Sequence, residues 1–238
     1  MEKEMTNLER AIKKHYDQGE LLRAEDLAKR DPGLDISKEV LKRMEDIRSW
    51  NKFGKPHGYV DPDSWEQMPK FQRIHDIIKK EFKGKGVHLL DVGCFTGFFS
   101  RTMNKFGHDC HGCDIQSKLM KILNVRERSE IFHPVAAENI SLYFTPGAFE
   151  VITFIDSIEH VLYDKAAINA AKQLLNPHGM IILHVPRNDL YPDTSKEHLR
   201  IYTKESFLDL LPGSKIEDCK DEHGNPTFLV YWKKGVIL

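Results

Sequence analysis

The chain contains 238 residues, 40% of them hydrophobic and 30% charged, which is enough for one sizeable α/β core and an extension. The 35 lysine and arginine residues nearly balance the 36 aspartate and glutamate residues, and the net charge of −1 gives no global electrostatic case for nucleic acid or an anionic membrane as a partner. The segment 1–22 is charged throughout and no stretch approaches about 18 apolar residues, so we expect a cytoplasmic protein without a membrane span. Its four cysteines are expected to be reduced thiols.

The first 50 residues are rich in helix-forming residues and are broken by Gly19 and by the sequence DPGLD at 31–35, which predicts about three short helices. Stacked helical repeats need about three copies and only one is visible, so we expect a solitary helical extension. The aromatic-rich segment 50–70 is either a flap over a ligand or a clasp that fixes the extension to the core. We therefore expect residues 1–66 to form a helical extension with an aromatic loop, which could engage a protein partner, and residues 67–238 to form the main domain.

Strands and helices alternate from residue 71 onward. After a helix with an apolar face that begins at Phe71, strands are expected at 87–92, 109–114, 131–135, 149–155 and 180–185, and helices at 97–106, 116–125, 164–175 and 204–211. This alternation predicts right-handed βαβ units and a doubly wound, Rossmann-like, mostly parallel sheet with helices on both faces. The segment 214–235 reads as two strands joined by EHGNP, which predicts an antiparallel C-terminal hairpin at the edge of the sheet.

The stretch VHLLDVGCFTGFFS (87–100) is an apolar run followed by an acid and a glycine turn. In a doubly wound sheet the first turn from strand to helix approaches the ligand most closely, and glycines there remove the Cβ that would block the approach. Asp91 stands at the strand end before Gly93, where a carboxylate would repel a pyrophosphate, so a cationic ligand group suits the turn better. Asp114 ends the next strand, at the interval from which a carboxylate holds ribose hydroxyls.

With these features, the chain from Val87 onward resembles the class I S-adenosylmethionine-dependent methyltransferases. The matching pieces, in the order of the family, are LLDVGCFTGFFS, GCDI, AAENISL, FEVITFIDSIEHV, LLNPHGMIILHVP and HLRIYTKESFLDLL. The resemblance implies that S-adenosylmethionine is the cofactor and that its contacts come from Asp91, Gly93, Cys94, Gly97, Asp114, Ile115, Ala137, Glu138 and Asp156. Within that set, Asp91 would orient the ammonium group, Asp114 would hold the ribose and Ile115 would lie against the adenine.

Two positions depart from the pattern of the family. Phe95 stands where many members have glycine, so the turn there must have a negative φ or must tolerate a bulky residue. Ala136 stands where many members have an acid toward the adenine amine, which leaves recognition of the base to backbone groups and to Glu138.

The sequence IDSIEHV after the fourth expected strand places Asp156, Glu159 and His160 at i, i+3 and i+4, on one face of a helical turn. His198 follows the fifth strand after a loop. The four side chains could hold a divalent metal ion that acidifies an acceptor hydroxyl, and they resemble the ExxEH motif and later histidine of metal-dependent O-methyltransferases of the ubiquinone type and of those acting on small-RNA 3′ ends. Alternatively, His160 or His198 acts as a metal-free catalytic base, or the turn is only structural.

The acceptor is expected to be the hydroxyl of a small molecule or a sugar, bound with the help of His184, Arg187, Asn188 and Tyr191 after the fifth strand. An RNA 3′ end is the alternative, although the near-neutral charge disfavours it. A non-catalytic cofactor-fold module and a nicotinamide-dependent oxidoreductase are the other classes, and Asp91 argues against the latter. The basic run KKEFKGK (79–85) could contact phosphates, but such a run at the end of a helix is usually a solvated face.

Overall fold

The computed structural model describes residues 5–17, 21–49, 68–187, 190 and 198–235. By its internal contacts the chain divides into two compact units, the first formed by 1–59 and 116–132 and the second by 60–115 and 133–238. The expected aromatic loop before residue 67 lies outside the described residues.

The first unit is helical. It contains α1 (Asn7–Asp17), α2 (Leu21–Ala28), α3 (Asp35–Ser49) and α6 (Ser117–Glu127). The three N-terminal helices form as the sequence predicts, and their small core of Ile12, Ala24, Ala28 and Val40 also includes Val125 from α6. A helix expected as part of the α/β alternation therefore packs with the N-terminal helices.

The second unit is built on the sheet. The strands are β1 (His88–Val92), β2 (Asp109–Cys113), β3 (Phe132–His133), β4 (Phe149–Ile155), β5 (Leu175–Pro186), β6 (Lys215–Lys220) and β7 (Pro226–Lys233), in the spatial order β3-β2-β1-β4-β5-β7-β6. Strand β1 pairs in parallel with β2 and β4, and β4 with β5, whereas β7 pairs antiparallel with β5 and β6. The predicted doubly wound fold with an antiparallel C-terminal hairpin is confirmed, and its strand order reverses between β1 and β4, where such folds bind ligands.

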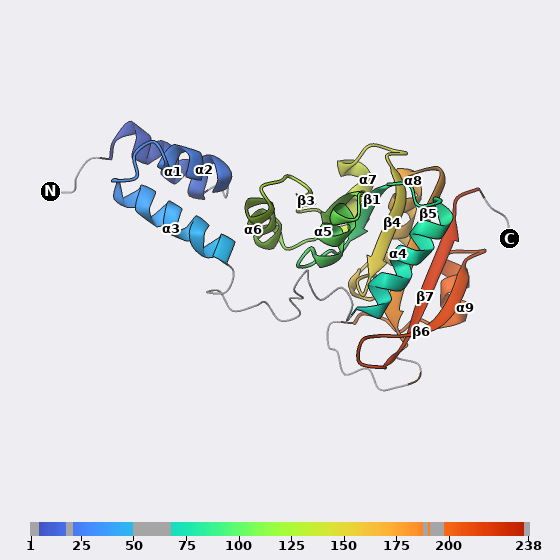
Figure 1. Ribbon diagram of the computed structural model, residues 1–238. Helices are drawn as coiled ribbons and strands as arrows, with labels where there is room; N and C mark the ends of the chain where they lie inside the picture. Colours follow the sequence, from blue (N-terminus) through green and yellow to red (C-terminus); the bar gives the residue numbers. More distant parts are fainter. Residues whose placement is uncertain (1–4, 18–20, 50–67, 188–189, 191–197, 236–238) are drawn as a thin grey trace. The chain divides into compact units, whose positions relative to one another are not determined.

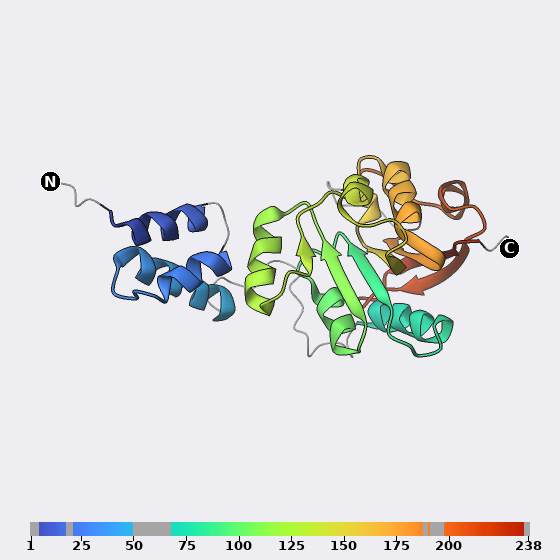
Figure 2. The same ribbon diagram turned by 90° about the horizontal axis from the view of Figure 1, so that it is seen from above.

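Helices cover both faces of this sheet (Figures 1 and 2). On one face α4 (Pro69–Glu81) and α5 (Phe98–Lys105) bury a core with Ile74, Ile78 and Met103. On the other face lie α7 (Ile140–Tyr143), α8 (Asp164–Leu174) and α9 (Lys204–Leu210), which bury Ile168 and Phe207. The apolar residues of neighbouring strand positions alternate between the two cores, because both faces of a parallel sheet are buried.

Strand β5 begins earlier than the sequence predicts, at Leu175 rather than at 180. The turn-forming sequence NPHG is accommodated as an irregularity, since the pairing with β4 moves from Phe149 opposite Leu175 to Val151 opposite Met180. The Asn176 amide donates to the Glu150 carboxylate at 2.9 Å and helps to fix this bulge. A turn signal in the sequence therefore produces a bulge inside a strand.

Candidate active site

The glycine turn joins β1 to α5 at the carboxyl end of the sheet. The backbone N–H groups of Gly93 and Cys94 donate to the carbonyl oxygen of Cys113 at 2.8 and 3.0 Å, which ties the turn to the end of β2. Gly93 and Gly97 have φ angles of 75° and 68°, in the left-handed region that favours glycine. The glycine pattern thus corresponds to real backbone demands at both positions.

Ser157, in the turn after β4, packs directly against this glycine turn. Its hydroxyl donates to the carbonyl oxygen of Val92 at 2.8 Å. A Cβ at Gly93 would lie 2.4 Å from the Cβ of Ser157, closer than real carbon contacts come. The turns after β1 and β4 are therefore in contact, and Gly93 is required by its protein neighbour as well as by any ligand.

Phe95 adopts a φ of 44° and not a negative φ. Of the two expected alternatives, the turn therefore tolerates a bulky residue, which it holds in the left-handed conformation. Such a conformation costs a residue with a Cβ about 1–2 kcal/mol. The Phe95 N–H donates to the Asp114 carboxylate at 3.2 Å, which offsets part of that cost and links the turn to the acid at the end of β2.

Asp91 lies almost fully buried at the end of β1. Its two carboxylate oxygens accept hydrogen bonds from the Ser100 hydroxyl at 3.0 Å and from the Thr153 hydroxyl at 2.9 Å. Burial raises the pKa of Asp91 to about 6, against the two hydrogen bonds, which lower it. Asp91 therefore joins β1, α5 and β4 beneath the glycine turn.

This raised pKa predicts that cofactor affinity will depend on pH if Asp91 faces an ammonium group. Below about pH 6 the folded protein without ligand holds a proton on Asp91, and a neutral carboxyl attracts a cation less than a carboxylate does. We expect the affinity for S-adenosylhomocysteine, measured by calorimetry, to fall by up to about tenfold per pH unit below pH 6. The Asp91→Asn variant should bind weakly and without this acid dependence; an unchanged pH profile in that variant would remove Asp91 from ammonium recognition.

The residues expected around the adenosine follow β2 and β3. Ile115 is a large aliphatic side chain with 75% of its surface exposed, whereas Ala137 is buried and only 9% exposed. Glu138 accepts the backbone N–H of Tyr163 at 3.2 Å, so part of its carboxylate is engaged by the segment before α8. An exposed aliphatic side chain next to Asp114, which lies under the glycine turn, suits a ribose and a base.

Glu159, His160 and His198 come together in the structure. Each offers a ligand atom, and these atoms lie within 4.8 Å of one another, while the two imidazole rings meet edge to face with centroids 4.8 Å apart. Glu159 and His160 belong to the short 3-10 helix η3 (Ile158–His160), which begins directly after Ser157. The cluster therefore stands next to the glycine turn.

Hydrogen bonds to backbone carbonyls of the segment after β4 bring His198 to this place. The N–H of Leu199 donates to the Glu159 carbonyl at 2.9 Å. The Arg200 guanidinium donates to the carbonyls of Val161 at 2.6 Å and Leu162 at 2.9 Å. The segment after β5 is thus fastened along the segment after β4, and two parts of the chain about 40 residues apart form one cluster.

Asp156, the fourth residue of the expected metal set, is not part of this cluster. One carboxylate oxygen pairs with the Lys70 ammonium at 2.7 Å, and the other contacts His184 Nδ1 at 2.6 Å. Burial works to raise the pKa of Asp156, but His184 and Lys70 outweigh burial and lower it below the usual range. Its φ of 49° is a strained backbone conformation of the kind that gathers at functional sites.

Lys70 lies between two carboxylates, because Glu222 from the turn between β6 and β7 approaches it at 3.3 Å. The Lys70 side chain is only 12% exposed. Burial disfavours its charge, yet Asp156 and Glu222 outweigh burial and raise the pKa of Lys70. We call Lys70, Asp156, His184 and Glu222 the Lys70 network; it joins α4, β5 and the hairpin at the carboxyl edge of the sheet.

The residues expected to contact substrate after β5 have different surroundings. His184 lies inside β5 and is 1% exposed, and its Nε2 has no hydrogen-bond partner among the described residues. Arg187 pairs with Asp218 at 2.6 Å on the hairpin. Asn188 and Tyr191 lie outside the described residues. Sequence reasoning missed Lys70, which carries no motif and lies 86 residues from Asp156, and it missed Ser157.

The sheet order, the glycine turn after β1 and the acid after β2 define a class I S-adenosylmethionine-dependent methyltransferase. The family model described as "Methyltransferase domain" matches residues 64–224, and the chain belongs to this family. The resemblance in the sequence is therefore confirmed.

Curated relatives include ubiquinone biosynthesis O-methyltransferases. The protein of Ralstonia nicotianae is 24% identical over 159 residues, which cover 62% of this chain and 65% of the relative. That of Nitrosococcus oceani is 28% identical, and the match covers 49% of this chain and 54% of the relative. That of Leptothrix cholodnii is 28% identical over 76% of this chain and 78% of the relative. For the first two, the match spans less than two thirds of the relative.

Solved structures share the fold. A protein of Pyrococcus horikoshii superposes with a TM-score of 0.57 at 21% identity, covering 74% of this chain and 94% of that one. A SAM-dependent methyltransferase of Archaeoglobus fulgidus gives 0.56 at 15% identity, covering 69% and 92%. The cyclase SpnF gives 0.56 at 20% identity, covering 69% and 81%. The reaction must therefore be argued from the site and not from the fold.

In the part of the chain that the structure describes, no helix has the length and apolarity to cross a bilayer.

Proposed function

We propose that the protein transfers a methyl group from S-adenosylmethionine to a hydroxyl group of a small molecule or a sugar. The observation that supports this most is the Glu159, His160 and His198 cluster, whose neighbour Ser157 touches the glycine turn. Proton-accepting and metal-binding side chains beside the cofactor turn are what an oxygen acceptor requires, because a hydroxyl must lose its proton to become a good nucleophile.

The residues around the glycine turn fit the cofactor. Buried Asp91, the Asp114 carboxylate and exposed Ile115 offer partners for an ammonium group, a ribose and a base. Gly93, Cys94 and Gly97 bring the backbone close to the methionine part, and Ala137 and Glu138 edge the base. When bound, S-adenosylmethionine supplies an electrophilic methyl group on a sulfonium. The protein then contributes mainly alignment and exclusion of water, which are worth up to about 7–11 kcal/mol in well-oriented systems.

We further propose that Glu159, His160 and His198 hold a divalent cation. One carboxylate and two imidazoles are a donor set that suits Zn²⁺ or Mn²⁺, and three protein ligands leave positions for an acceptor hydroxyl. The cation would lower the pKa of that hydroxyl. Asp156, whose oxygens pair with Lys70 and His184, would support the site from the neighbouring position and not bind the ion.

Without an ion, His160 or His198 would take the hydroxyl proton directly. We expect His198→Ala to lower the rate of S-adenosylhomocysteine formation with a catechol acceptor by about 10²-fold or more, because general-base catalysis alone contributes about 10²–10⁴. Calorimetric affinity for S-adenosylhomocysteine should persist. His178, an exposed histidine in the β5 bulge, gives the matched control variant His178→Ala.

Chelation separates the two versions of the mechanism. Treatment with a chelator should remove activity and added Mn²⁺ or Zn²⁺ should restore it if the cluster holds a cation; activity that survives chelation assigns the proton transfer to the histidines alone. A wild-type rate in both His160→Ala and His198→Ala would remove the cluster from the chemistry.

The same assay addresses the alternatives. An RNA 3′ end is the acceptor if RNA supports turnover and small hydroxyl compounds do not. A non-catalytic module would bind the cofactor but turn over no acceptor.

We also propose that residues 67–238 form the methyltransferase domain, which the family match from residue 64 supports, and that the N-terminal helices outside that match serve a protein partner.

A further inference from the structure

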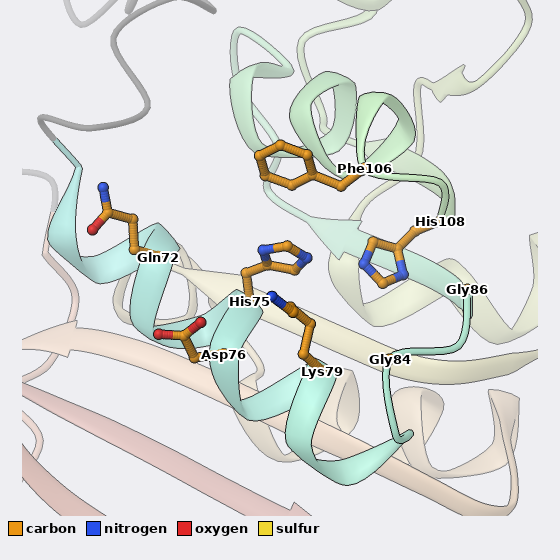
Figure 3. A pocket seen from close by; sticks show the side chains of 8 residues that line it. All are labelled: Gln72, His75, Asp76, Lys79, Gly84, Gly86, Phe106 and His108. Carbon is orange, nitrogen blue, oxygen red and sulfur yellow. The ribbon is translucent and has the colours of Figure 1, made fainter.

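A cavity of about 520 Å³ lies at the opposite edge of the sheet from the cofactor turn. Its walls are the outward side of α4, the loop before β1 and the turn from α5 to β2 (Figure 3). It is lined by Gln72, His75, Asp76, Lys79, Gly84, Gly86, Phe106 and His108. Gly86 and His108 each stand just before a strand, so this cavity adjoins the amino ends of β1 and β2, whereas the glycine turn lies at the carboxyl end of β1.

The cavity gathers cationic and proton-donating side chains from distant parts of the chain. Figure 3 shows the imidazoles of His75 and His108 and the end of Lys79 around one space. The His75 ring stacks on Phe106 at 4.7 Å and meets the His108 ring edge to face at 5.3 Å. Lys79 begins the basic run 79–85, so at least one of its lysines faces a cavity.

His108 is held in one orientation. It is 9% exposed, and its Nδ1 accepts the backbone N–H of Val87 at 3.3 Å. Because Nδ1 is the acceptor, the neutral ring carries its proton on Nε2, and that N–H remains a donor. The Nε2–H donor of His108 is therefore already oriented before any ligand binds.

An anion suits this cavity better than a metal ion, because Lys79 supplies a positive charge and the imidazoles supply N–H donors. Burial, the neighbouring His108 and the Lys79 ammonium lower the pKa of His75, and burial lowers that of His108. A bound anion would favour the protonated form of His75, whereas His108 stays neutral, since its Nδ1 accepts the Val87 N–H, and donates from Nε2. Asp76 and the carbonyl end of α4 oppose an anion. Binding should therefore tighten as His75 becomes protonated and adds a positive charge to that of Lys79. Among the described residues, His75 and His108 do not form a three-ligand group suited to a metal ion.

We propose that this cavity binds a small phosphate-bearing molecule, with the phosphate at Lys79, His75 and His108 and a ring of the ligand on Phe106. The volume exceeds the needs of inorganic phosphate alone and falls within the range of about 300–1,000 Å³ of small-molecule sites. Phe106 is 45% exposed, so part of its ring surface is accessible to a ligand beside the stacked His75 ring. The site is separate from the methyl-transfer site and does not depend on the function proposed above.

The test uses the full-length protein saturated with S-adenosylhomocysteine, with inorganic phosphate and phenyl phosphate as probes. We expect both probes to shift the imidazole NMR signals of His75 and His108 saturably, and phenyl phosphate to bind at least about fivefold more tightly. Lys79→Gln should weaken both probes at least tenfold. Lys80→Gln, the next residue on the same helix and outside this cavity, should leave both affinities unchanged.

Phe106→Ala separates the two parts of the site, because it should abolish the preference for phenyl phosphate and keep the affinity for inorganic phosphate. Probes that shift neither imidazole, or equal effects of the Lys79 and Lys80 substitutions, would overturn the proposal. Thermal unfolding of each variant shows whether a loss of binding reflects a loss of fold.

Discussion

Gly93→Ala is expected to destabilise the protein by about 2–5 kcal/mol and to abolish cofactor binding. The left-handed φ of 75° costs a residue with a Cβ about 1–2 kcal/mol. The new methyl group would also lie 2.4 Å from the Cβ of Ser157, and overpacking of this kind adds about 1–3 kcal/mol. Denaturant unfolding and calorimetry with S-adenosylhomocysteine measure the two effects.

Gly84→Ala is the matched control for the conformational cost of placing a residue with a Cβ at a left-handed φ. Gly84 has a φ of 72°, but nothing lies within 4 Å of an added Cβ, so only the conformational cost should appear. Removing the obstructing side chain should recover part of the loss, so the double variant Gly93→Ala with Ser157→Gly should be more stable than additivity of the two single variants predicts. Equal destabilisation by Gly93→Ala and Gly84→Ala would show that Ser157 does not confine the turn.

Lys70→Met is expected to lower turnover more than tenfold and stability by about 2–3 kcal/mol. Methionine keeps much of the volume of the side chain but removes the ammonium, which leaves the Asp156 and Glu222 carboxylates close together without their cation. Breaking a fully buried pair costs about 3–5 kcal/mol, and the 35% exposure of Asp156 reduces that figure. Urea unfolding and initial rates of S-adenosylhomocysteine formation are the measurements.

The pH dependence of stability gives the Lys70 network a distinct signature. The folded-state pKa of Asp156 is lowered, so its contribution to stability is present above its ordinary value near 3.8 and is lost as the pH falls through the folded value. Without Lys70 the pKa of Asp156 in the folded protein should rise toward its ordinary value. The pH range over which acid removes the contribution of Asp156 to stability should then become narrower. Lys70→Arg keeps the charge and should retain most of the stability, while Lys80→Met on the exposed side of α4 should change little. An acid profile in Lys70→Met identical to that of the wild type would show that Lys70 does not control Asp156.

Local patterns explain which parts of the site the sequence reveals. Asp91, Gly93 and Asp114 lie at strand ends, and the alternation of strands and helices fixes their spacing along the chain. His198 also joins His160 as expected, because the segments after β4 and β5 both emerge at the carboxyl edge of a parallel sheet.

Long-range pairing explains what the sequence does not reveal. Lys70 reaches Asp156 because α4 begins at the carboxyl edge of the sheet, and no local spacing encodes that position. The same holds for α6, whose apolar residue Val125 packs with the N-terminal helices and could equally have covered the sheet. The sequence NPHG is typical of a turn but forms a bulge within β5, where Asn176 donates a hydrogen bond to the Glu150 carboxylate of the neighbouring strand.

The position of β7 within the sheet has a consequence for biosynthesis. This strand, Pro226–Lys233, lies between β5 and β6. While the ribosome is still making it, β5 has one unpaired side and β6 has no partner, so the parallel half of the sheet must wait with an open, aggregation-prone edge. The Glu222 contact of Lys70 also forms only when the hairpin closes, so the nascent chain completes the Lys70 network only after β7 has been made.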